Sequence, residues 1–201
     1  MFKISIMCGS QRRDSQSGKV ALFIRSLIEQ VGGIETYLLD LGKEPLALWT
    51  DDPAVQEAQD QVWQPIAAHL RNSEGLVFVT PDWNGMSPPA LKNFFLYCTR
   101  NEIADQAALL VGVSSGAGGV ASTSELRMSS YKDTHVCYIP EQVIVRDVRA
   151  VLNSPAAESE QDAYTRFRLE YALKVLVEYG KALTEVRRSN VRNFELVPYG
   201  M

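Results

Sequence analysis

Short runs of apolar residues alternate along the chain with longer segments in which apolar residues recur every three or four positions. A continuous apolar run is typical of a strand buried on both faces of a parallel sheet, and the longer period is that of an amphipathic helix. The predicted strands are residues 3–8, 34–41, 75–79 and 107–113, and a fifth strand made of 136–139 and 143–145. The predicted helices are residues 17–31, 54–72, 91–98, 120 to about 131, and 161–188.

Glycine and proline mark several of these boundaries. Gly32 and Gly33 follow the first helix, as expected of a helix C-cap. Pro65 predicts a break or kink in the second helix, because proline lacks the N–H that a helix interior needs. Pro140 interrupts the fifth strand for the same reason.

The alternation of strands and helices predicts an α/β fold with a parallel, doubly wound sheet and right-handed crossovers. With five strands, the expected order is 2-1-3-4-5, which is the flavodoxin-like order. Residues 1–188 are predicted to form this domain, and residues 189–201 to form a C-terminal tail without clear periodicity.

Composition and charge limit the classes of function. Of 201 residues, 46% are hydrophobic and 22% are charged, which is ordinary for a soluble globular domain. The net charge of −4 argues against a nucleic-acid-binding protein, and no apolar run reaches the roughly 18 residues of a membrane span. The N-terminus lacks the features of a signal peptide, so we expect a cytoplasmic protein. Cys8, Cys98 and Cys137 lie far apart, which suits a reducing compartment and gives neither a disulfide nor a metal-binding framework.

Three loops of unusual composition follow the first, third and fourth strands. In the expected strand order they are neighbours at the carboxyl edge of the sheet, where such sheets bind ligands. The first loop, residues 9–17, offers hydroxyls and an arginine in front of a helix N-terminus, a combination suited to phosphate. Its candidate binding residues are Ser10, Arg12, Ser15, Gln16 and Ser17. The alternative is a plain capping loop, since serine is a common N-cap; the loop does not match the Walker motif.

The second loop, residues 80–93, is the stretch around which the chain is organised. It lies between a buried strand and a helix that begins with two prolines. It offers an indole face, a primary amide, a glycine and unpaired backbone N–H groups, which are the groups that a flat ring rich in heteroatoms needs. The candidate residues are Pro81, Asp82, Trp83, Asn84 and Gly85.

The third loop, residues 114–119, has more than one interpretation. Residues 116–121 fit the dinucleotide pattern G-x-G-x-x-A, but they follow the fourth strand instead of the first and lack the acidic residue expected about 20 positions further on. A further interpretation is that the small residues of this loop let a flat ring approach its backbone N–H groups. The candidates for that role are Ser115, Gly116 and Gly119.

Residues 112–116 also fit the nucleophile elbow G-x-S-x-G, which would make Ser114 the nucleophile of a serine hydrolase. Such an enzyme needs a histidine near the serine. The only downstream histidine is His135, which enters the fifth strand, and His69 lies upstream on a helix. The hydrolase stays open as an alternative.

These loops together resemble the NADPH-dependent FMN reductase family, a flavodoxin-like group that includes chromate, quinone and azo-dye reductases. The family opens with G-S-x-R-x-x-S, matched by residues 9–15, and its flavin-ring loop T-P-E-Y-N-x-S-x-P-x-x-L-K-N is largely matched by residues 80–93. Residues 114–119 and the pair Leu126-Arg127 are similar to a later family motif. The positions that depart from the family pattern are Asp82 for glutamate, Trp83 for tyrosine, Met86 for serine and Leu96 for an acidic residue.

The resemblance implies an oxidoreductase that binds FMN, takes a hydride from NADPH or NADH, and reduces a small acceptor such as a quinone, a flavin, an azo compound or a metal oxyanion. It places the FMN phosphate on the first loop and the isoalloxazine ring against residues 81–85, with Asn84 at the pyrimidine edge and residues 115–119 on the other side. No catalytic residue is expected, because the chemistry belongs to the cofactor. Relatives usually dimerise, so a homodimer is expected. A flavodoxin-type electron carrier, which would bind FMN without oxidising a nicotinamide, is a further alternative.

The last predicted helix, residues 161–188, has a charged face and an apolar face. Arg166 and its charged neighbours are expected to be solvated. Phe167 and Tyr171 are expected to pack on the sheet with the helix's leucines. The tyrosines that could instead meet a second subunit are Tyr164, Tyr171 and Tyr179.

Overall fold

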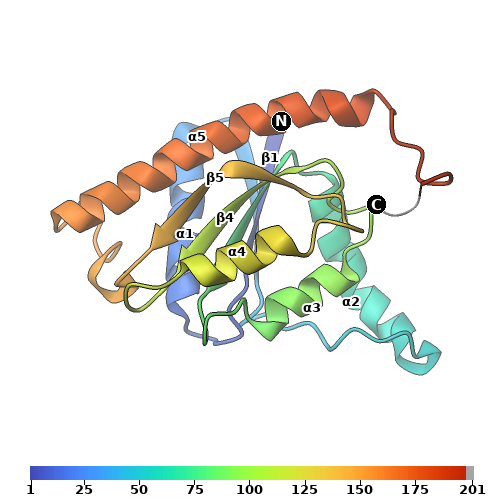
Figure 1. The fold of residues 1–201 in the computed structure, drawn as a ribbon, viewed down its shortest axis with the longest axis horizontal. Coiled ribbons are helices and arrows are strands. Elements are labelled where there is room, and N and C mark those ends of the chain that lie inside the picture. The colour runs from blue at the N-terminus through green and yellow to red at the C-terminus, as the bar shows by residue number, and fades with distance from the viewer. Residues whose placement is uncertain (198–201) are drawn as a thin grey trace.

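The computed structural model describes residues 1–197 and shows a five-stranded parallel sheet with helices on both faces (Figure 1). The strand order is β2-β1-β3-β4-β5, which confirms the predicted fold class and order. The strands are β1 (Phe2–Cys8), β2 (Ile34–Asp40), β3 (Gly75–Pro81), β4 (Ala107–Val113) and β5 (Cys137–Val145). The helices are α1 (Gln16–Val31), α2 (Pro53–Arg71), α3 (Pro89–Tyr97), α4 (Val120–Met128), α5 (Glu160–Arg188) and the short 3-10 helix η1 (Val148–Ala150).

The sheet separates two apolar cores, because alternate residues of each strand point to opposite faces. In β3, Val77 and Val79 pack with α1 and α5, while Leu76 and Phe78 pack with α2, α3 and α4. Every residue of β3 and β4 is buried, which explains why these strands are continuous apolar runs in the sequence. In Figure 1, α5 runs above the sheet, and α3 and α4 lie below it.

β5 is one strand, and the predicted interruption at Pro140 is a bulge in its pairing with β4. Ala108 pairs with Tyr138, but Leu110 pairs with Gln142, so extra residues of β5 are accommodated between these pairs. β5 is an edge strand of the sheet. A residue without an N–H is tolerated there, because one side of the strand has no neighbour to bond.

Two predicted helix features are wrong. The predicted break at Pro65 is wrong, because α2 continues through Pro65 to Arg71, while a kink there stays a prediction. Pro65 lies on the exposed side of α2, where the carbonyl that lacks a helical N–H donor is open to solvent. α4 ends at Met128 instead of near residue 131, and Ser130 just beyond it has a positive φ of 61°, which a helix does not allow.

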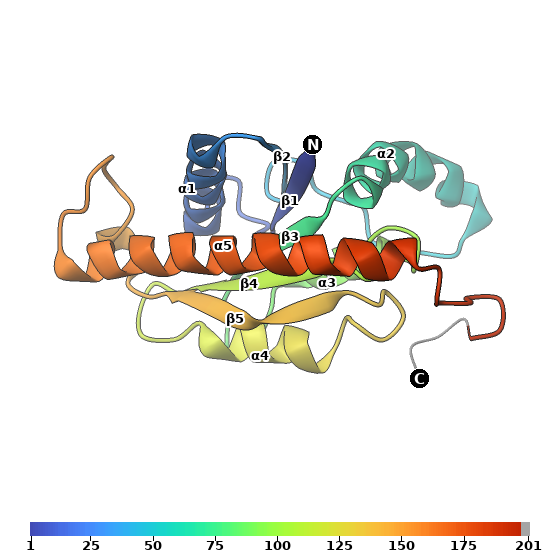
Figure 2. The same ribbon diagram turned by 90° about the horizontal axis from the view of Figure 1, so that it is seen from above.

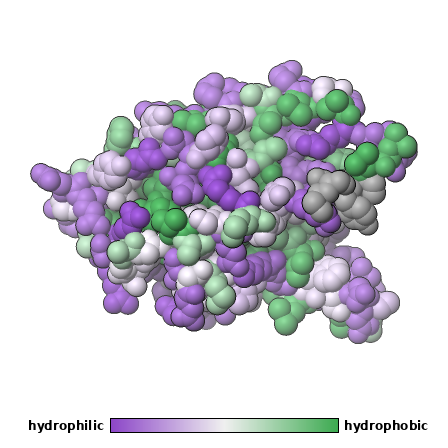
Figure 3. All heavy atoms as spheres, in the orientation of Figure 1, coloured by the Kyte–Doolittle hydropathy of each residue, from purple (hydrophilic) through white to green (hydrophobic). Residues whose placement is uncertain are grey.

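α5 places its aromatic residues differently from the prediction. Phe167 and Tyr171 do not pack on the sheet; they are 58% and 43% exposed. Aliphatic residues with helical spacing fill the core instead, namely Leu169, Leu173 and Leu176. Figure 3 shows that hydrophobic residues on the viewed face form separate clusters among polar ones. α5 has 29 residues, but no helix of residues 1–197 is long and apolar enough to cross a membrane.

Arg166 is not the solvated side chain that the sequence predicts. Its guanidinium pairs with the fully buried Asp162 (Nε–Oδ1 3.0 Å) and donates to the carbonyls of Ser154 and Pro155. Asp162 also accepts the Leu152 N–H at 2.9 Å. This network therefore fixes the start of α5 to the loop that precedes it.

The residues after α5 dock on the amino-terminal edge of the sheet. Arg192 forms a bidentate ion pair with Asp105, just before β4 (Nε–Oδ2 2.5 Å, Nη2–Oδ1 2.7 Å). Phe194 packs beside His135, with ring centroids 5.1 Å apart. Figure 2 shows this segment leaving one end of α5, while the other end of the helix extends past the sheet. Residues 198–201 of the predicted tail lie outside the described residues.

Candidate cofactor-binding site

A cleft of about 290 Å³ lies at the carboxyl edge of the sheet, where the loops after β1, β3 and β4 meet. β1 and β3 are adjacent, and the strand order reverses between them, so the cleft lies at the topological switch point. The lining residues are Ser10, Arg12, Asp14, Ser15, Gln16, Ser17, Pro81, Asp82, Trp83, Val113, Ser115, Val148 and Arg149.

The serines of the first loop have different roles. Ser15 caps α1, because its Oγ accepts the Gly18 N–H at 2.9 Å. Ser10 is 1% exposed, and its Oγ accepts the Arg12 N–H at 3.3 Å. Ser17 is 2% exposed and lines the cleft, yet its hydroxyl has no hydrogen-bond partner among residues 1–197. Ser17 Oγ is not one of the buried side-chain atoms that lack a partner, so this hydroxyl reaches the cleft and can donate to a ligand oxygen there. Capping and phosphate binding are therefore compatible in this loop.

Asn84 and Gly85 form the exposed tip of the second loop. Trp83 and Met86 exchange two backbone hydrogen bonds of 3.1 and 3.0 Å around them. The φ angles of Asn84 and Gly85 are 53° and 74°. This is the type I′ turn that the Asn-Gly pair favours, because both residues tolerate positive φ.

Asp82 connects the second loop to the third. Its Oδ1 accepts the Gly85 N–H at 3.0 Å, and its Oδ2 accepts the Gly119 N–H at 2.8 Å. Gly119 has a φ of 104°, and a Cβ there would lie 2.7 Å from Ile144, so only glycine fits. Asp82 therefore positions the loops around the cleft.

Trp83 borders the cleft in contact with the first loop. The guanidinium of Arg12 lies over its ring, 4.8 Å from the ring centroid. The other tryptophans lie away from the cleft. Trp63 is buried beside Phe94 of α3, and Trp49 is half-exposed in the segment before α2.

The end of the second loop is held by contacts outside the cleft. Lys92 pairs with Glu125 of α4, and Glu125 also accepts the Ser87 N–H at 2.6 Å. Burial alone would raise the pKa of Glu125, but the bonds from Lys92 and Ser87 and the charge of Lys92 lower it. Asn93 bonds the backbone of Ala47 and Trp49 at 2.8 Å each. These residues therefore stabilise the loop and do not line the cleft.

Val148 and Arg149 of η1 line the cleft, and sequence reasoning missed them. The Val148 N–H donates to the Ser114 carbonyl at 3.1 Å, and the Asp147 N–H donates to the Gly116 carbonyl at 3.2 Å. These bonds hold the segment after β5 against the third loop. A signal was available, because the segment follows a strand that ends at the same edge of the sheet.

The cleft brings together most of the predicted cofactor residues. Those that line it are Ser10, Arg12, Ser15, Gln16, Ser17, Pro81, Asp82, Trp83 and Ser115. Those outside its lining are Asn84, Gly85, Gly116 and Gly119. Asp14 and Val113 line it without having been predicted. A role of each predicted residue in binding a cofactor stays a prediction.

The serine hydrolase alternative is incompatible with the geometry. Ser114 lies at the carboxyl end of β4, whereas the His135 carbonyl accepts the Asp105 N–H just before β4 begins. A seven-residue strand separates these points by about 20 Å. His69, the second of the two histidines, contacts Lys3 at the amino-terminal end of β1. Neither histidine can act as the base for Ser114.

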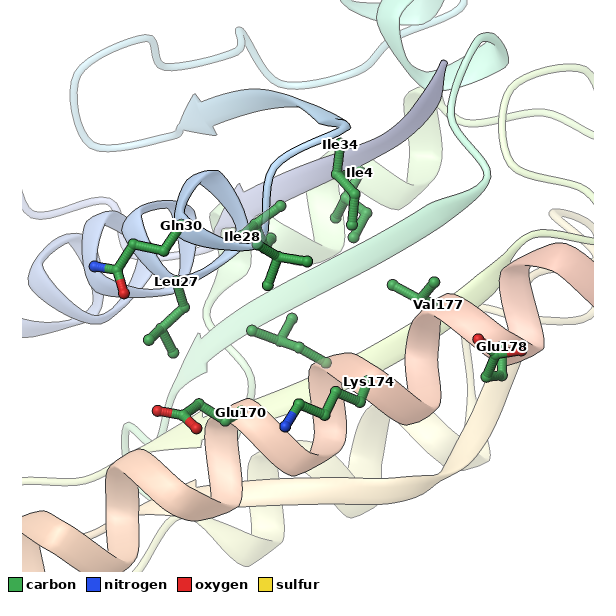
Figure 4. Close-up of a pocket in the computed structure, with 11 residues that line it drawn as sticks. Ile4, Leu27, Ile28, Gln30, Ile34, Glu170, Lys174, Val177 and Glu178 are labelled. Atoms are coloured by element: carbon green, nitrogen blue, oxygen red, sulfur yellow. The ribbon is translucent and has the colours of Figure 1, made fainter.

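A second groove, of about 390 Å³, lies between α1 and α5 (Figure 4). Ile4 and Ile34 place it at the amino-terminal ends of β1 and β2, and Lys174 and Glu178 border it from α5. Here α1 ends, and a helix C-terminus repels anions. The groove therefore does not suit a phosphate-bearing cofactor.

Comparison with known proteins identifies the family of this chain. The family model described as NADPH-dependent FMN reductase matches residues 2–149. The chain belongs to the NADPH-dependent FMN reductase family. The match contains all three predicted loops and ends at Arg149. As a member of this family, the chain is an NAD(P)H-dependent oxidoreductase.

The relatives of this chain include quinone reductases and an NADPH azoreductase of Bacillus sp.. A 2-hydroxy-1,4-benzoquinone reductase of Burkholderia sp. is 30% identical over 152 residues, which are 73% of this chain and 80% of the relative. A quinone reductase of Pseudomonas putida is 26% identical over 134 residues, 64% of this chain and 69% of the relative. The structure of FerB, a flavoenzyme NAD(P)H:(acceptor) oxidoreductase from Paracoccus denitrificans, superimposes with a TM-score of 0.74 at 22% identity, covering 90% of this chain and 98% of that chain. This structural likeness shows a shared fold.

Proposed function

We propose that the chain binds FMN in the cleft at the carboxyl edge and passes electrons from NADPH or NADH to a small acceptor, with quinones as the preferred class. The family supports FMN and NADPH, and the relatives named for quinones support the acceptor. An azo compound, a second flavin or a metal oxyanion is an alternative acceptor.

The observation that carries the proposal is a phosphate cradle and an aromatic platform in one cleft. Ser10, Ser17 and the first N–H groups of α1 form the cradle, since those N–H groups have no partner within the helix, although that of Gly18 is already bonded to the Ser15 cap. Pro81 and Trp83 form the platform. FMN joins a phosphate to a flat ring, so its two ends need these two kinds of surface. The unpartnered Ser17 hydroxyl fits a phosphate oxygen.

Bound FMN would supply the hydride chemistry, which no side chain of this cleft provides. The residues of the chain bind and orient it. The hydroxyls and the positive end of the α1 dipole hold the phosphate, and Asp82 keeps the second and third loops in register around the ring. The ionisable residues among those that line the cleft are Arg12, Asp14, Asp82 and Arg149, and we assign none of them a proton transfer.

A reconstitution experiment tests the proposal. Quinone reduction by NADPH and by NADH is measured before FMN removal, after removal and after FMN is added back. We expect activity that is lost and then restored. If the protein binds FMN but neither NADPH nor NADH reduces that FMN, the proposed enzyme activity is rejected and an electron carrier of the flavodoxin type is favoured.

We also propose that the chain forms a homodimer in a reducing cytoplasm. The exposed aromatic side chains on α5 support the dimer. The compartment is supported by the cysteines, since Cys8, Cys98 and Cys137 are all unpaired thiols. The exposed tyrosines of α5 are Tyr164, Tyr171 and Tyr179. Sedimentation equilibrium is expected to give the mass of a dimer, and a monomer at all accessible concentrations would reject it.

A further inference from the structure

We propose that Arg149 binds the phosphate of FMN and makes the cleft select FMN over riboflavin, which lacks the phosphate. This inference rests on the proposed function. It adds a phosphate-binding residue on η1, outside the three loops that the sequence singles out, and it concerns which flavin the cleft accepts.

Arg149 has a guanidinium that is free to bind a ligand. It lines the cleft, it is exposed, and its side chain makes no hydrogen bond or ion pair with any residue from 1 to 197. Arg12 differs, because its guanidinium already lies over the Trp83 ring. Ser17, whose hydroxyl has no hydrogen-bond partner among residues 1–197, lines the same cleft. Two donors without protein partners, on α1 and on η1, therefore border one cavity.

The charges around the cleft favour a second cation at the phosphate. A phosphate monoester carries about −1.5 to −2 charges at neutral pH. Asp14 also lines the cleft, and its carboxylate opposes the binding of an anion. The positive end of α1 and Arg12 must neutralise the charge of the phosphate and also offset the repulsion from Asp14. Arg149 supplies an additional full positive charge for this. Its planar guanidinium can donate two parallel hydrogen bonds to phosphate oxygens.

Lys19 of α1 holds the segment that carries Arg149. Its Nζ donates to the carbonyls of Val148 at 2.6 Å and Val151 at 2.8 Å, and to Oδ1 of Asn153 at 2.8 Å. These three bonds use all three donors of the ammonium group. The Asn153 side chain in turn donates to the Arg149 carbonyl at 2.9 Å. α1 and η1 are thus fixed to each other before a ligand binds, which lowers the entropy cost of binding.

The test compares two flavins that differ only in the phosphate. FMN and riboflavin are titrated into flavin-free wild type, Arg149→Ala, Arg149→Lys and Arg13→Ala, with flavin fluorescence as the readout. Arg13 is the matched control, because it is exposed, lies one residue from Arg12 and does not line the cleft. Far-UV circular dichroism and the thermal unfolding midpoint establish that each variant is folded.

We expect Arg149→Ala to raise the Kd for FMN about 10- to 100-fold, the range for a lost hydrogen bond to a charged group, and to leave riboflavin within about twofold. Arg149→Lys should recover part of the loss, and Arg13→Ala should change neither flavin. An equal loss for both flavins would overturn the proposal, as would an unchanged FMN affinity accompanied by a raised KM for NADPH. If the wild type binds neither flavin, the proposed function itself is rejected. If the wild type binds FMN and Arg149→Ala binds it with the same affinity, only the role of Arg149 is rejected.

Discussion

The guanidinium of Arg12 lies over the indole ring of Trp83, 4.8 Å from the ring centroid. Arg12 belongs to the loop expected to hold a phosphate, and Trp83 to the loop expected to border a flat ring. Cation–π contacts of this kind contribute about 0.5–2 kcal/mol, depending on how far water is excluded. The two ends of the cleft are therefore coupled by a direct contact.

Arg12→Ala should weaken FMN binding by about 1.5–3 kcal/mol, because it removes a charged donor from the phosphate loop. The variant also removes the contact over Trp83, so the tryptophan emission of the flavin-free protein should change. FMN titration measures the affinity. Arg12→Lys is the control, since it keeps the charge but loses the planar group. An affinity unchanged within about twofold would show that the phosphate is held elsewhere.

Trp83→Leu should brighten the fluorescence of bound flavin or change turnover, because an aromatic ring next to a flavin quenches it. Trp49→Leu is the matched control, since Trp49 is 47% exposed and lies outside the cleft lining. Trp63→Leu is a weaker control, because Trp63 packs in the core and its loss opens a cavity. If Trp83→Leu and Trp49→Leu show the same emission and the same turnover as wild type, Trp83 only packs and the ring lies elsewhere.

The sheet could be predicted from sequence because its signals are local and agree with one another. β3 and β4 are continuous apolar runs, and topology rules then order five parallel strands with few alternatives. The faces of α5 were predicted less well. Its surface carries aromatic residues at helical spacing, and Phe167 and Leu169 cannot be told apart by hydrophobicity alone. Arg166 looks like a surface charge until the buried Asp162 is placed beside it.

The residues of the cleft can be predicted where a loop has both a suitable composition and a place at the carboxyl edge of the sheet. They cannot be predicted where the place in the topology is the only signal. The first loop has a phosphate-binding composition, so its residues could be named. η1 is three residues long and has no motif, so Arg149 was overlooked although it follows a strand at the same edge. The sequence predicts Asp82 as a ligand-binding residue, but not its bond to Gly119, which lies in another loop 37 residues further along the chain.

Ser114→Ala should leave NADPH-dependent reduction largely intact. The Ser114 hydroxyl accepts the Gly116 N–H at 3.2 Å, and losing that bond should cost only about 0.5–1.5 kcal/mol of stability. Steady-state reduction of a quinone measures the first effect and thermal unfolding the second. Labelling by a fluorophosphonate probe, or ester hydrolysis that vanishes in the variant, would contradict the assignment and return the hydrolase to consideration.

Protein stability should fall as the pH drops below about 6.5, in part through His69. Its ring stacks on Tyr37 with centroids 4.0 Å apart, and its Nδ1 lies 3.1 Å from the Lys3 ammonium group. Burial and then the charge of Lys3 lower the pKa of His69 from its ordinary value of 6.5. Below that value the unfolded chain binds the proton more readily than the folded chain, so unfolding becomes more favourable as the pH falls.

The contribution of His69 can be isolated with His69→Gln. The free energy of unfolding is measured by urea denaturation between pH 7.5 and about 5.5, the range in which a histidine titrates. Wild type should lose more stability than the variant over this range. An equal or steeper loss in His69→Gln would show that His69 is not responsible.

The visible spectrum of the purified protein during anaerobic titration with NADPH shows whether the chain is an FMN-dependent reductase. We expect a yellow protein, or one that becomes yellow on addition of FMN, whose heat-released chromophore is FMN. NADPH should bleach the bound flavin, and a quinone should restore the colour. Protein that stays colourless in excess FMN, or whose bound flavin is bleached by neither NADPH nor NADH, would show that the chain is not an FMN-dependent NAD(P)H oxidoreductase.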